Sequence, residues 1–404
     1  MSAAIESTPN SPRRSARLLT FHAATLGSFF AASAAPTPLY RLYQENFAAS
    51  PVLITIVFAV YAFALLMALL IVGSISDHLG RKPVIFAALV VEMAAMGLFI
   101  AADGSDWLIA ARIVQGLATG TATASIGAAL VDVDRASGQI VNSIGPLLGM
   151  AVGALGTGAL IAYGPEPMHL VYALLLIVFA LQAAAIWLIP ETVEKRPGML
   201  ASLKPDVAVP AQVKRPLRLV TPINISVWTL GGFYLSLIPS LIASTTGSSS
   251  PITGGAVVAA LTVSGAVAVF LSRKRTAPTN LTFGVSSMTL GILTVTGGVH
   301  SGNVALLIAG TVIAGAGFGT SFLGSVSTIM PLAKPEERAG LLSAFYTQSY
   351  LAFSLPAIVA GFLAKAIGYR LTTDIYAAVI IVMMVGGLMT LRAANARTKD
   401  CAVS

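Results

Sequence analysis

The sequence carries little charge. Only 10% of its 404 residues are Asp, Glu, Lys or Arg, whereas 56% are hydrophobic. Soluble globular proteins have roughly 25% charged residues and use them to cover their surface. The composition therefore excludes soluble cytosolic, nuclear and secreted enzymes, and it predicts a protein embedded in a lipid bilayer.

Cysteine and clustered metal ligands are also scarce. Cys401 is the only cysteine, so the chain cannot form an internal disulfide. The four histidines are dispersed and no H-E-x-x-H pattern occurs, which predicts no metal site and no cofactor. The sequence also lacks a G-x-x-x-x-G-K-[ST] phosphate loop, which argues against an ATP-driven pump. A membrane enzyme would need clustered His, Asp or Cys at membrane depth, so we expect a protein that is not an enzyme.

Long apolar runs are abundant instead. A helix needs about 20 apolar residues to cross the hydrocarbon layer. The first run follows Arg13, Arg14 and Arg17, but it is longer than the apolar core of a signal peptide, which favours a membrane span. The pattern predicts an all-α polytopic membrane protein with twelve transmembrane helices. The twelve runs cover about 18–40, 51–72, 83–101, 107–131, 138–162, 168–189, 218–243, 252–271, 279–298, 304–329, 340–365 and 375–391.

The basic residues predict the orientation of these helices. With the N-terminus in the cytoplasm, 20 of the 24 Lys and Arg residues fall in cytoplasmic loops and tails. Only Arg41, Lys365 and Arg370 fall outside, and Arg112 lies within a span. The positive-inside rule therefore places both termini in the cytoplasm, in a multi-pass protein of the inner (plasma) membrane. A nucleic-acid surface would need a contiguous basic patch with aromatic residues, which the sequence lacks.

A polar, proline-rich segment at 191–217 divides the chain near its midpoint. The stretch 115–121 is similar to 314–320, at an offset of 199 residues. Because six helices return the chain to its starting side, the two halves are expected to share one orientation, which is a known transporter plan. The predicted parts are a cytoplasmic tail at 1–17, six-helix bundles at 18–190 and 218–391, the cytoplasmic linker at 191–217 and a cytoplasmic tail at 392–404.

The loop after the second run combines glycines with charges. It reads Gly73-Ser-Ile-Ser-Asp77-His-Leu-Gly80-Arg81-Lys82. The glycines allow a tight turn, and the aspartate can cap the helix that follows. The loop resembles the signature G-x-x-x-D-x-x-G-R-[RK] of the major facilitator superfamily, at the expected position in a twelve-helix chain.

This resemblance implies two pseudo-symmetric six-helix bundles and a conformational latch. In the family, the Asp and Arg of this loop pair with an acid at the inner end of span four. Asp132 matches that position, and Asp134 is a weaker candidate. The alternative is that the loop is only a capped turn that fixes the topology.

Two further motifs resemble elements of the same family, in particular of its bacterial drug/proton antiporter-like exporters. Span four matches R-x-x-Q-G, and span five matches the G-P-x-x-G element enriched in exporters. Val141 and Met150 stand where the exporter element usually has glycine, so a packing helix without an exporter role is the alternative. The matching residues are Arg112, Gln115 and Gly116 in span four and Gly145, Pro146 and Gly149 in span five.

Two residues carry a formal charge inside the spans, Glu92 and Arg112. A charge facing lipid costs several kcal/mol, so each is a functional candidate. Counted at 1.5 Å per residue, their heights differ by roughly 6 Å, which predicts an ion pair. The alternative is a protonated Glu92 at a helix contact, with Arg112 bonded to backbone carbonyls. His22 is a further candidate for proton transfer, or an ordinary interface residue.

The expected function is secondary active transport by alternating access, as proton-coupled export of small amphipathic organic molecules by a functional monomer. The alternative is uptake or facilitated passage of a neutral or anionic metabolite. Many drug–proton antiporters of the family have an acid in span one, and this chain has none. Aromatic walls with sparse polar groups suit amphipathic solutes. The candidates for the substrate cavity are Phe29, Ser33, Thr119, Asn142, Trp228, Tyr234, Phe318, Phe322, Tyr346, Gln348 and Tyr350.

Overall fold

The computed structural model describes residues 12–194, 196–247 and 250–403, and all regular structure in these ranges is helical. Within them, eleven helical stretches are long and apolar enough to cross a membrane. The last stretch, 335–394, contains two crossings, because Gly368 leaves the helical conformation with φ 80° and ψ 167°. The predicted all-α fold with twelve crossings is therefore confirmed.

The start of α3 shows capping chemistry and an apolar run acting at the same place. Ser50 accepts a hydrogen bond from the Leu53 amide and is followed by Pro51, a favourable first helical residue. Polar residues can continue a helix beyond the hydrocarbon layer, so several helices exceed the predicted spans by a few residues. The helices are α1 (Pro12–Ala34), α2 (Pro36–Asn46), α3 (Pro51–Val72), α4 (Ile75–Leu79), α5 (Arg81–Ile100), α6 (Ser105–Val133), α7 (Arg135–Tyr163) and α8 (Pro167–Ala185).

The C-terminal half follows a short linker. The predicted linker ended at 217, whereas α10 begins at Lys214, because the charged residues that begin α10 still form helix outside the apolar run. The elements are α9 (Met199–Ser202) in the linker, then α10 (Lys214–Thr246), α11 (Pro251–Ser272), α12 (Ala277–Ser301), α13 (Val304–Ile329) and α14 (Arg338–Val403).

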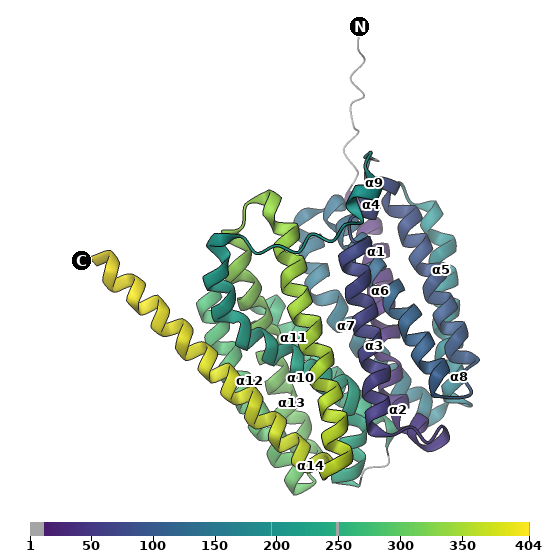
Figure 1. Ribbon diagram of the computed structural model, residues 1–404. Coiled ribbons are helices and arrows are strands. Elements are labelled where there is room, and N and C mark those ends of the chain that lie inside the picture. Colours follow the sequence, from purple (N-terminus) through teal and green to yellow (C-terminus); the bar gives the residue numbers. More distant parts are fainter. Residues whose placement is uncertain (1–11, 195, 248–249, 404) are drawn as a thin grey trace.

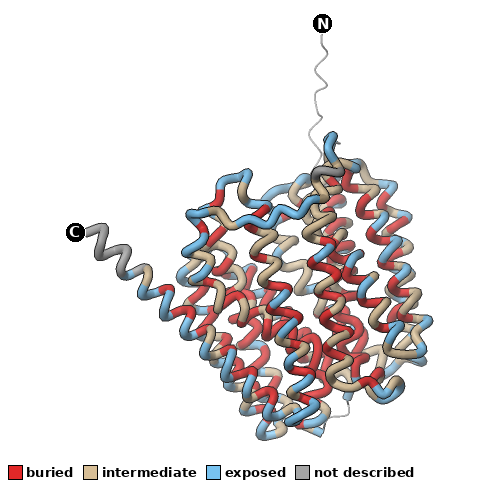
Figure 2. The backbone as a smooth tube through the Cα atoms, in the orientation of Figure 1, coloured by how far each residue is buried: buried red, intermediate tan, exposed pale blue. Residues whose placement is uncertain are grey.

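The helices stand side by side, so the molecule has two ends (Figure 1). One end carries α4 and α9 and is called the α4 end; the opposite end carries α2 and is called the α2 end. Figure 2 shows that buried residues run through the interior of both halves, while exposed residues lie on the outward faces. Large apolar side chains are among the exposed ones, including Val152, Leu181 and Leu188. An apolar exterior of this kind is what a bilayer requires.

The internal repeat is visible in how glycines bring two helix pairs together. A side chain at Gly116 or Gly120 would collide with the backbone of α3. A side chain at Gly315 or Gly319 would collide in the same way with the backbone of α11. The same close contact, small residues against a neighbouring helix, therefore joins α6 to α3 and α13 to α11.

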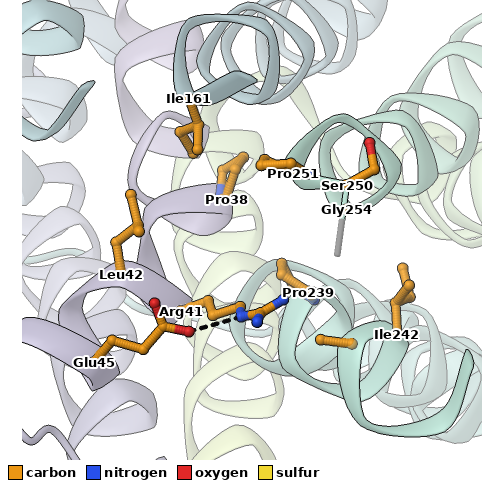
Figure 3. A pocket seen from close by; sticks show the side chains of 11 residues that line it. Pro38, Arg41, Leu42, Glu45, Ile161, Pro239, Ile242, Ser250, Pro251 and Gly254 are labelled. Atoms are coloured by element: carbon orange, nitrogen blue, oxygen red, sulfur yellow. Dashed lines mark hydrogen bonds and ion pairs between the residues drawn. The ribbon is translucent and has the colours of Figure 1, made fainter. Parts of the chain in front are cut away.

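The halves are joined by hydrogen bonds at the α2 end. Thr37 Oγ1 donates to the Leu235 carbonyl at 2.8 Å, and Ser240 Oγ donates to Gln44 Oε1 at 3.0 Å. A cavity of about 180 Å³ lies beside these bonds, and Figure 3 shows the ion pair of Arg41 with Glu45 on its wall.

Candidate functional site

At the α4 end, Arg81 is the centre of a charge cluster. Its Nη1 lies 2.6 Å from Asp77 Oδ1, and its Nε donates to Asp132 Oδ2 at 3.0 Å. Nη1 also donates to Ser76 Oγ at 2.6 Å, and the arginine side chain is only 8% exposed. The structure thus brings together Asp77 and Asp132 with the arginine between them, which is the geometry that a latch between α4, α5 and α6 needs.

Glu191 completes this cluster, and its role was not apparent from the sequence. Its carboxylate accepts hydrogen bonds from the backbone amides of Arg81 and Lys82, at 2.9 and 3.1 Å. These amides begin α5, where the helix dipole favours an anion. Gly80 makes the approach possible: its φ is 99°, and a Cβ there would stand 2.7 Å from Glu191 Oε2. Lys82 extends the contact, because its Nζ donates to the Trp187 carbonyl at 3.4 Å.

Asp134, the weaker candidate, has a different task. It lies at the start of α7 and accepts a hydrogen bond from the Ser137 amide at 2.6 Å. This backbone hydrogen bond lowers the pKa of the Asp134 carboxyl below its ordinary value. Asp134 is therefore a helix cap. Gly73, the first residue of the signature, ends α3 just before α4 begins.

The linker is fastened to both halves at the α4 end. The Arg196 amide donates to the Asp77 carbonyl at 3.2 Å, and Ser74 Oγ donates to the Ser202 carbonyl at 3.0 Å. Farther along, the Ala208 amide donates to the Gly340 carbonyl at 3.2 Å. The segment that carries Glu191 thus reaches the first turn of α14, so movement between the halves can act on the charge cluster.

A second polar cluster lies inside the N-terminal half, around Arg112. The Arg112 side chain is 1% exposed, and its guanidinium lies 4.1 Å from the centre of the Tyr61 ring. It donates to the carbonyls of Ser33 and Val57 at 3.1 and 3.4 Å, and to Gln115 Oε1 at 2.7 Å. The arginine therefore joins α1, α3 and α6 and is fully engaged within this half.

Glu92 and Arg112 do not form the direct ion pair expected from their heights. Among the described residues, Gln115 stands between them: its Nε2 donates to Glu92 Oε1 at 3.3 Å, while its Oε1 accepts from Arg112. The two charged residues lie on neighbouring helices, but the intervening amide occupies the space between them. The second oxygen of Glu92, Oε2, is buried and has no partner in the described chain.

His22 is the third proton candidate, and it lies in α1. Its side chain is buried, and neither ring nitrogen has a hydrogen-bond partner among the described residues. The imidazole is therefore a buried polar group that the described part of the chain leaves without a hydrogen-bond partner.

The span-five motif serves helix packing. Gly149 lies directly against the backbone of Gly27, so it lets α7 approach α1. A side chain at Gly145 would make only ordinary contacts with Leu26 and Val141, and Pro146 lies within the continuous helix α7. The structure therefore supplies a packing reason for the second glycine of the motif and none for the first.

Three of the side chains predicted to line the substrate cavity, all in the N-terminal half, contact other residues of that same half. Phe29 is buried against Phe179, with ring centres 5.2 Å apart. Asn142 Nδ2 donates to the Gly127 carbonyl at 2.9 Å, and Ser33 Oγ donates to the Phe30 carbonyl at 2.8 Å. All three contacts lie within the N-terminal half; Phe29 belongs to the buried core, which differs from the expected cavity lining, whereas Asn142 is half-buried.

Thr119 and Tyr234 are likewise buried in their own halves. The Thr119 hydroxyl has no hydrogen-bond partner in the described chain. The Tyr234 hydroxyl bonds Thr311 Oγ1 at 2.9 Å inside the C-terminal half. Sequence position alone could not separate core-facing from seam-facing side chains, because both lie on apolar helices.

The candidates of the C-terminal half form an aromatic cluster around Trp228. The Trp228 ring lies 5.0 Å from Tyr350, 5.6 Å from Phe353 and 6.2 Å from Phe322. Tyr346 adjoins Tyr350 at 6.3 Å. We call the set Trp228, Phe322, Tyr346, Tyr350 and Phe353 the aromatic cluster.

The aromatic cluster lies at the seam between the halves. The Phe353 ring is 4.8 Å from Phe58 of α3, and Phe353 and Tyr350 belong to a core cluster that is shared with buried residues of the N-terminal half. Trp228 Nε1 and Gln348 Nε2 are buried and without partners in the described chain. Phe318 packs close to Gly231 beside Phe353. The seam therefore combines aromatic surface with unused hydrogen-bond donors.

This architecture matches known transporters. The sequence pattern of the Major Facilitator Superfamily matches residues 19–301, well over half of the chain, and the chain belongs to this family of transporters. Three solved structures are similar in fold. The first is a bacterial homologue of the human lysosomal transporter Spinster, inward-facing and unoccupied, with a TM-score of 0.70, 15% sequence identity and 96% of each chain covered. The second is the human organic anion transporter MFSD10 (TETRAN), with a TM-score of 0.67, 17% identity, and 94% of this chain and 100% of that chain covered. The third is the nucleoside transporter NupG, with a TM-score of 0.73, 10% identity, and 92% of this chain and 99% of that chain covered.

Proposed function

We propose that this transporter exports small amphipathic organic molecules and couples their movement to protons. The observation that carries the proposal is the buried Glu92–Gln115–Arg112 chain inside the N-terminal half, together with the aromatic cluster at the seam between the halves. Glu92 has one carboxylate oxygen without a partner, which makes it a candidate for taking up and releasing a proton. Aromatic rings with sparse polar groups suit an amphipathic solute.

The proposed orientation places the α4 end and both termini in the cytoplasm of the inner membrane. The excess of Lys and Arg at that end supports it. In this orientation the hydrogen bonds between Thr37 and Leu235 and between Gln44 and Ser240 close the outer side, which corresponds to an inward-facing state. A tag at Ser404 and the 191–217 segment should then be cut by protease only from the cytoplasmic side, and cleavage from outside would overturn the orientation.

Transport into proteoliposomes tests the function. A labelled panel of amphipathic, anionic and neutral compounds would be assayed with and without a pH gradient. One proton crossing 100 mV contributes about 2.3 kcal/mol, enough for roughly a fifty-fold gradient of a neutral solute. We expect Glu92→Gln to abolish accumulation while downhill exchange continues. The matched control is Glu45→Gln, which changes an exposed acid paired with Arg41 at the α2 end.

The results separate the proton carriers. If Glu92→Gln still concentrates substrate under a pH gradient, Glu92 is not the carrier, and His22 or the charge cluster with Asp77 and Asp132 would take its place. If no compound responds to the gradient, proton coupling itself is wrong.

A second candidate function is passage of a neutral or anionic metabolite. It is favoured by Arg112, a formal cation at membrane depth, together with the lack of an acid in span one. One fold neighbour is an organic anion transporter by name, although at 17% identity it supports the fold alone. Anion uptake in the panel that is unaffected by the pH gradient would favour this candidate over the first.

A further inference from the structure

A groove runs along the outer face of the C-terminal half, between α12 and the last part of α14. Figure 1 shows this last part of α14 slanting away from the other helices toward the α4 end. The groove has a volume of about 450 Å³, and none of its lining residues is acidic. Its lining residues are Val285, Ser286, Thr289, Leu290, Leu293, Val385, Leu388, Met389 and Arg392.

Arg392 lines the groove at the end that lies toward the α4 end, and Arg275 lies near the start of α12 at the same end. Arg392 Nη2 donates to Thr282 Oγ1 at 3.2 Å, and the Arg275 guanidinium lies 5.9 Å from the centre of the Phe283 ring. Thr282 and Phe283 are consecutive residues of α12, so the two guanidinium groups lie at the same height along the helix, with Arg392 on the groove and Arg275 beside it. Neither arginine forms an ion pair with any residue that the structure describes. Two unpaired cations at the mouth of an apolar groove complement a ligand with a negative head and an apolar tail.

Hydroxyl groups continue from the arginines into the groove. Ser286 lies four residues beyond Thr282 and Thr289 lies seven beyond it, so they are roughly 6 and 10 Å deeper along the helix. The Thr289 hydroxyl is buried and has no hydrogen-bond partner in the described chain. Deeper still along α12 lie Leu290 and Leu293, while Val385, Leu388 and Met389 line the α14 side. Along α12, cation contact, hydroxyl groups and hydrocarbon therefore follow one another, and the α14 wall below Arg392 is aliphatic throughout.

We propose that this groove binds one anionic phospholipid. The phosphate lies between Arg392 and Arg275, the ester carbonyls accept hydrogen bonds from Ser286 and Thr289, and one acyl chain fills the aliphatic part. Charge, hydroxyl groups and apolar surface occur in the same order in the groove as phosphate, esters and chain occur in the lipid. The site lies on the bilayer side of α12, away from the aromatic cluster, so it goes beyond the proposed transport function and does not depend on it.

Native mass spectrometry of the full-length protein, delipidated in detergent, tests the site directly. The probes are phosphatidylglycerol and phosphatidylcholine with identical acyl chains. We expect the first phosphatidylglycerol to bind at a concentration about tenfold lower than phosphatidylcholine. Arg392→Gln and Arg275→Gln should each weaken phosphatidylglycerol binding about fivefold, while phosphatidylcholine binding is little changed. Arg135→Gln removes an exposed arginine at the start of α7 and is the matched control. It should leave the dissociation constants of both phosphatidylglycerol and phosphatidylcholine unchanged.

Two further measurements separate the contribution of the lipid headgroup to binding from that of the acyl chain. Ser286→Phe fills the groove without changing its charge, and we expect it to weaken binding of phosphatidylglycerol at least fivefold. Inorganic phosphate at millimolar concentration should not displace the lipid. Unchanged phosphatidylglycerol binding in Arg392→Gln and Arg275→Gln, no effect of Ser286→Phe, or full displacement by phosphate would each overturn the proposal.

Discussion

The two halves share one fold but differ in their charges at the α4 end. In the N-terminal half, the loop after α3 places Arg81 between Asp77 and Asp132, with Glu191 on the adjoining amides. In the C-terminal half, the corresponding loop after α11 has Arg273 packed on Phe270, without an acid. A six-helix half therefore does not need such a charge cluster to adopt this fold, and the cluster is a feature of the N-terminal half alone.

The interiors of the two halves also differ in charge, and again the charged residues lie in the N-terminal half. At the offset of 199 residues, Arg112 corresponds to Thr311 and Gln115 to Ala314. Thr311 bonds the Tyr234 hydroxyl, so a neutral pair stands where the N-terminal half has a buried cation. Under the proposed function, proton chemistry would therefore belong to the first half and the aromatic surface for substrate to the seam side of the second.

The largest expected effect comes from removing the buried cation. Arg112→Ala leaves Gln115 and the carbonyls of Ser33 and Val57 without their donor. Buried groups left unpaired cost about 1–3 kcal/mol each, so the free energy of unfolding should fall by roughly 3–5 kcal/mol. Denaturant unfolding in detergent measures this loss, and downhill exchange should also disappear. Tyr234→Phe removes the hydroxyl bonded to Thr311, the counterpart of Arg112, and should cost only about 1 kcal/mol. Equal losses would contradict the contrast between the halves.

The next largest effect is expected at Gly80. Its backbone, with φ 99° and ψ 153°, lies in a region that is essentially restricted to glycine, and a Cβ would also press on Glu191. We expect Gly80→Ala to lower the free energy of unfolding by about 2–3 kcal/mol. Gly247 also has a positive φ, of 66°, but no atom lies within 4 Å of where an alanine Cβ would stand. Gly247→Ala should therefore lower the free energy of unfolding by only about 1 kcal/mol. Similar losses would mean that the contact with Glu191 contributes nothing.

A smaller effect is expected from neutralising one acid of the charge cluster. Asp77→Asn removes one of the two carboxylates on Arg81, and transport should slow several-fold because the latch no longer holds one conformation firmly. Membrane insertion should be unchanged. Asp374→Asn affects an acid bonded to His300 at 2.9 Å in the other half and should not alter the rate. Wild-type rates in Asp77→Asn would remove the latch role.

The smallest effect compares two helix caps. Asp134 caps α7 with a charged group, and Asn303 caps α13 with a neutral one. The folded-state pKa of Asp134 is depressed, so its contribution to stability is present above its ordinary value of 3.8 and is lost as the pH falls through the folded pKa. The drop in melting temperature caused by Asp134→Ala should therefore shrink between pH 7 and pH 3. The drop caused by Asn303→Ala should stay constant, and a parallel decline in both would refute the assignment.

Much of this fold could be predicted because its causes are local. The run 51–72 coincides with α3, since apolar length and the cap at Ser50 both act within a few residues. The signature loop also indicated which charges would meet. Glu191 escaped prediction because it is more than a hundred residues from Arg81 in the chain, and only packing brings its carboxylate to the start of α5.

By itself the sequence determined the class of protein, the twelve crossings, the repeat and the uneven distribution of charge. These follow from composition and short-range pattern, because a bilayer excludes polar backbone and charge wherever they are not satisfied. Only the tertiary structure decided that Gln115 separates Glu92 from Arg112, and that Phe29 and Tyr234 lie in bundle cores. The rotation of each helix about its axis settles such contacts, and that rotation is fixed by close packing against its neighbours.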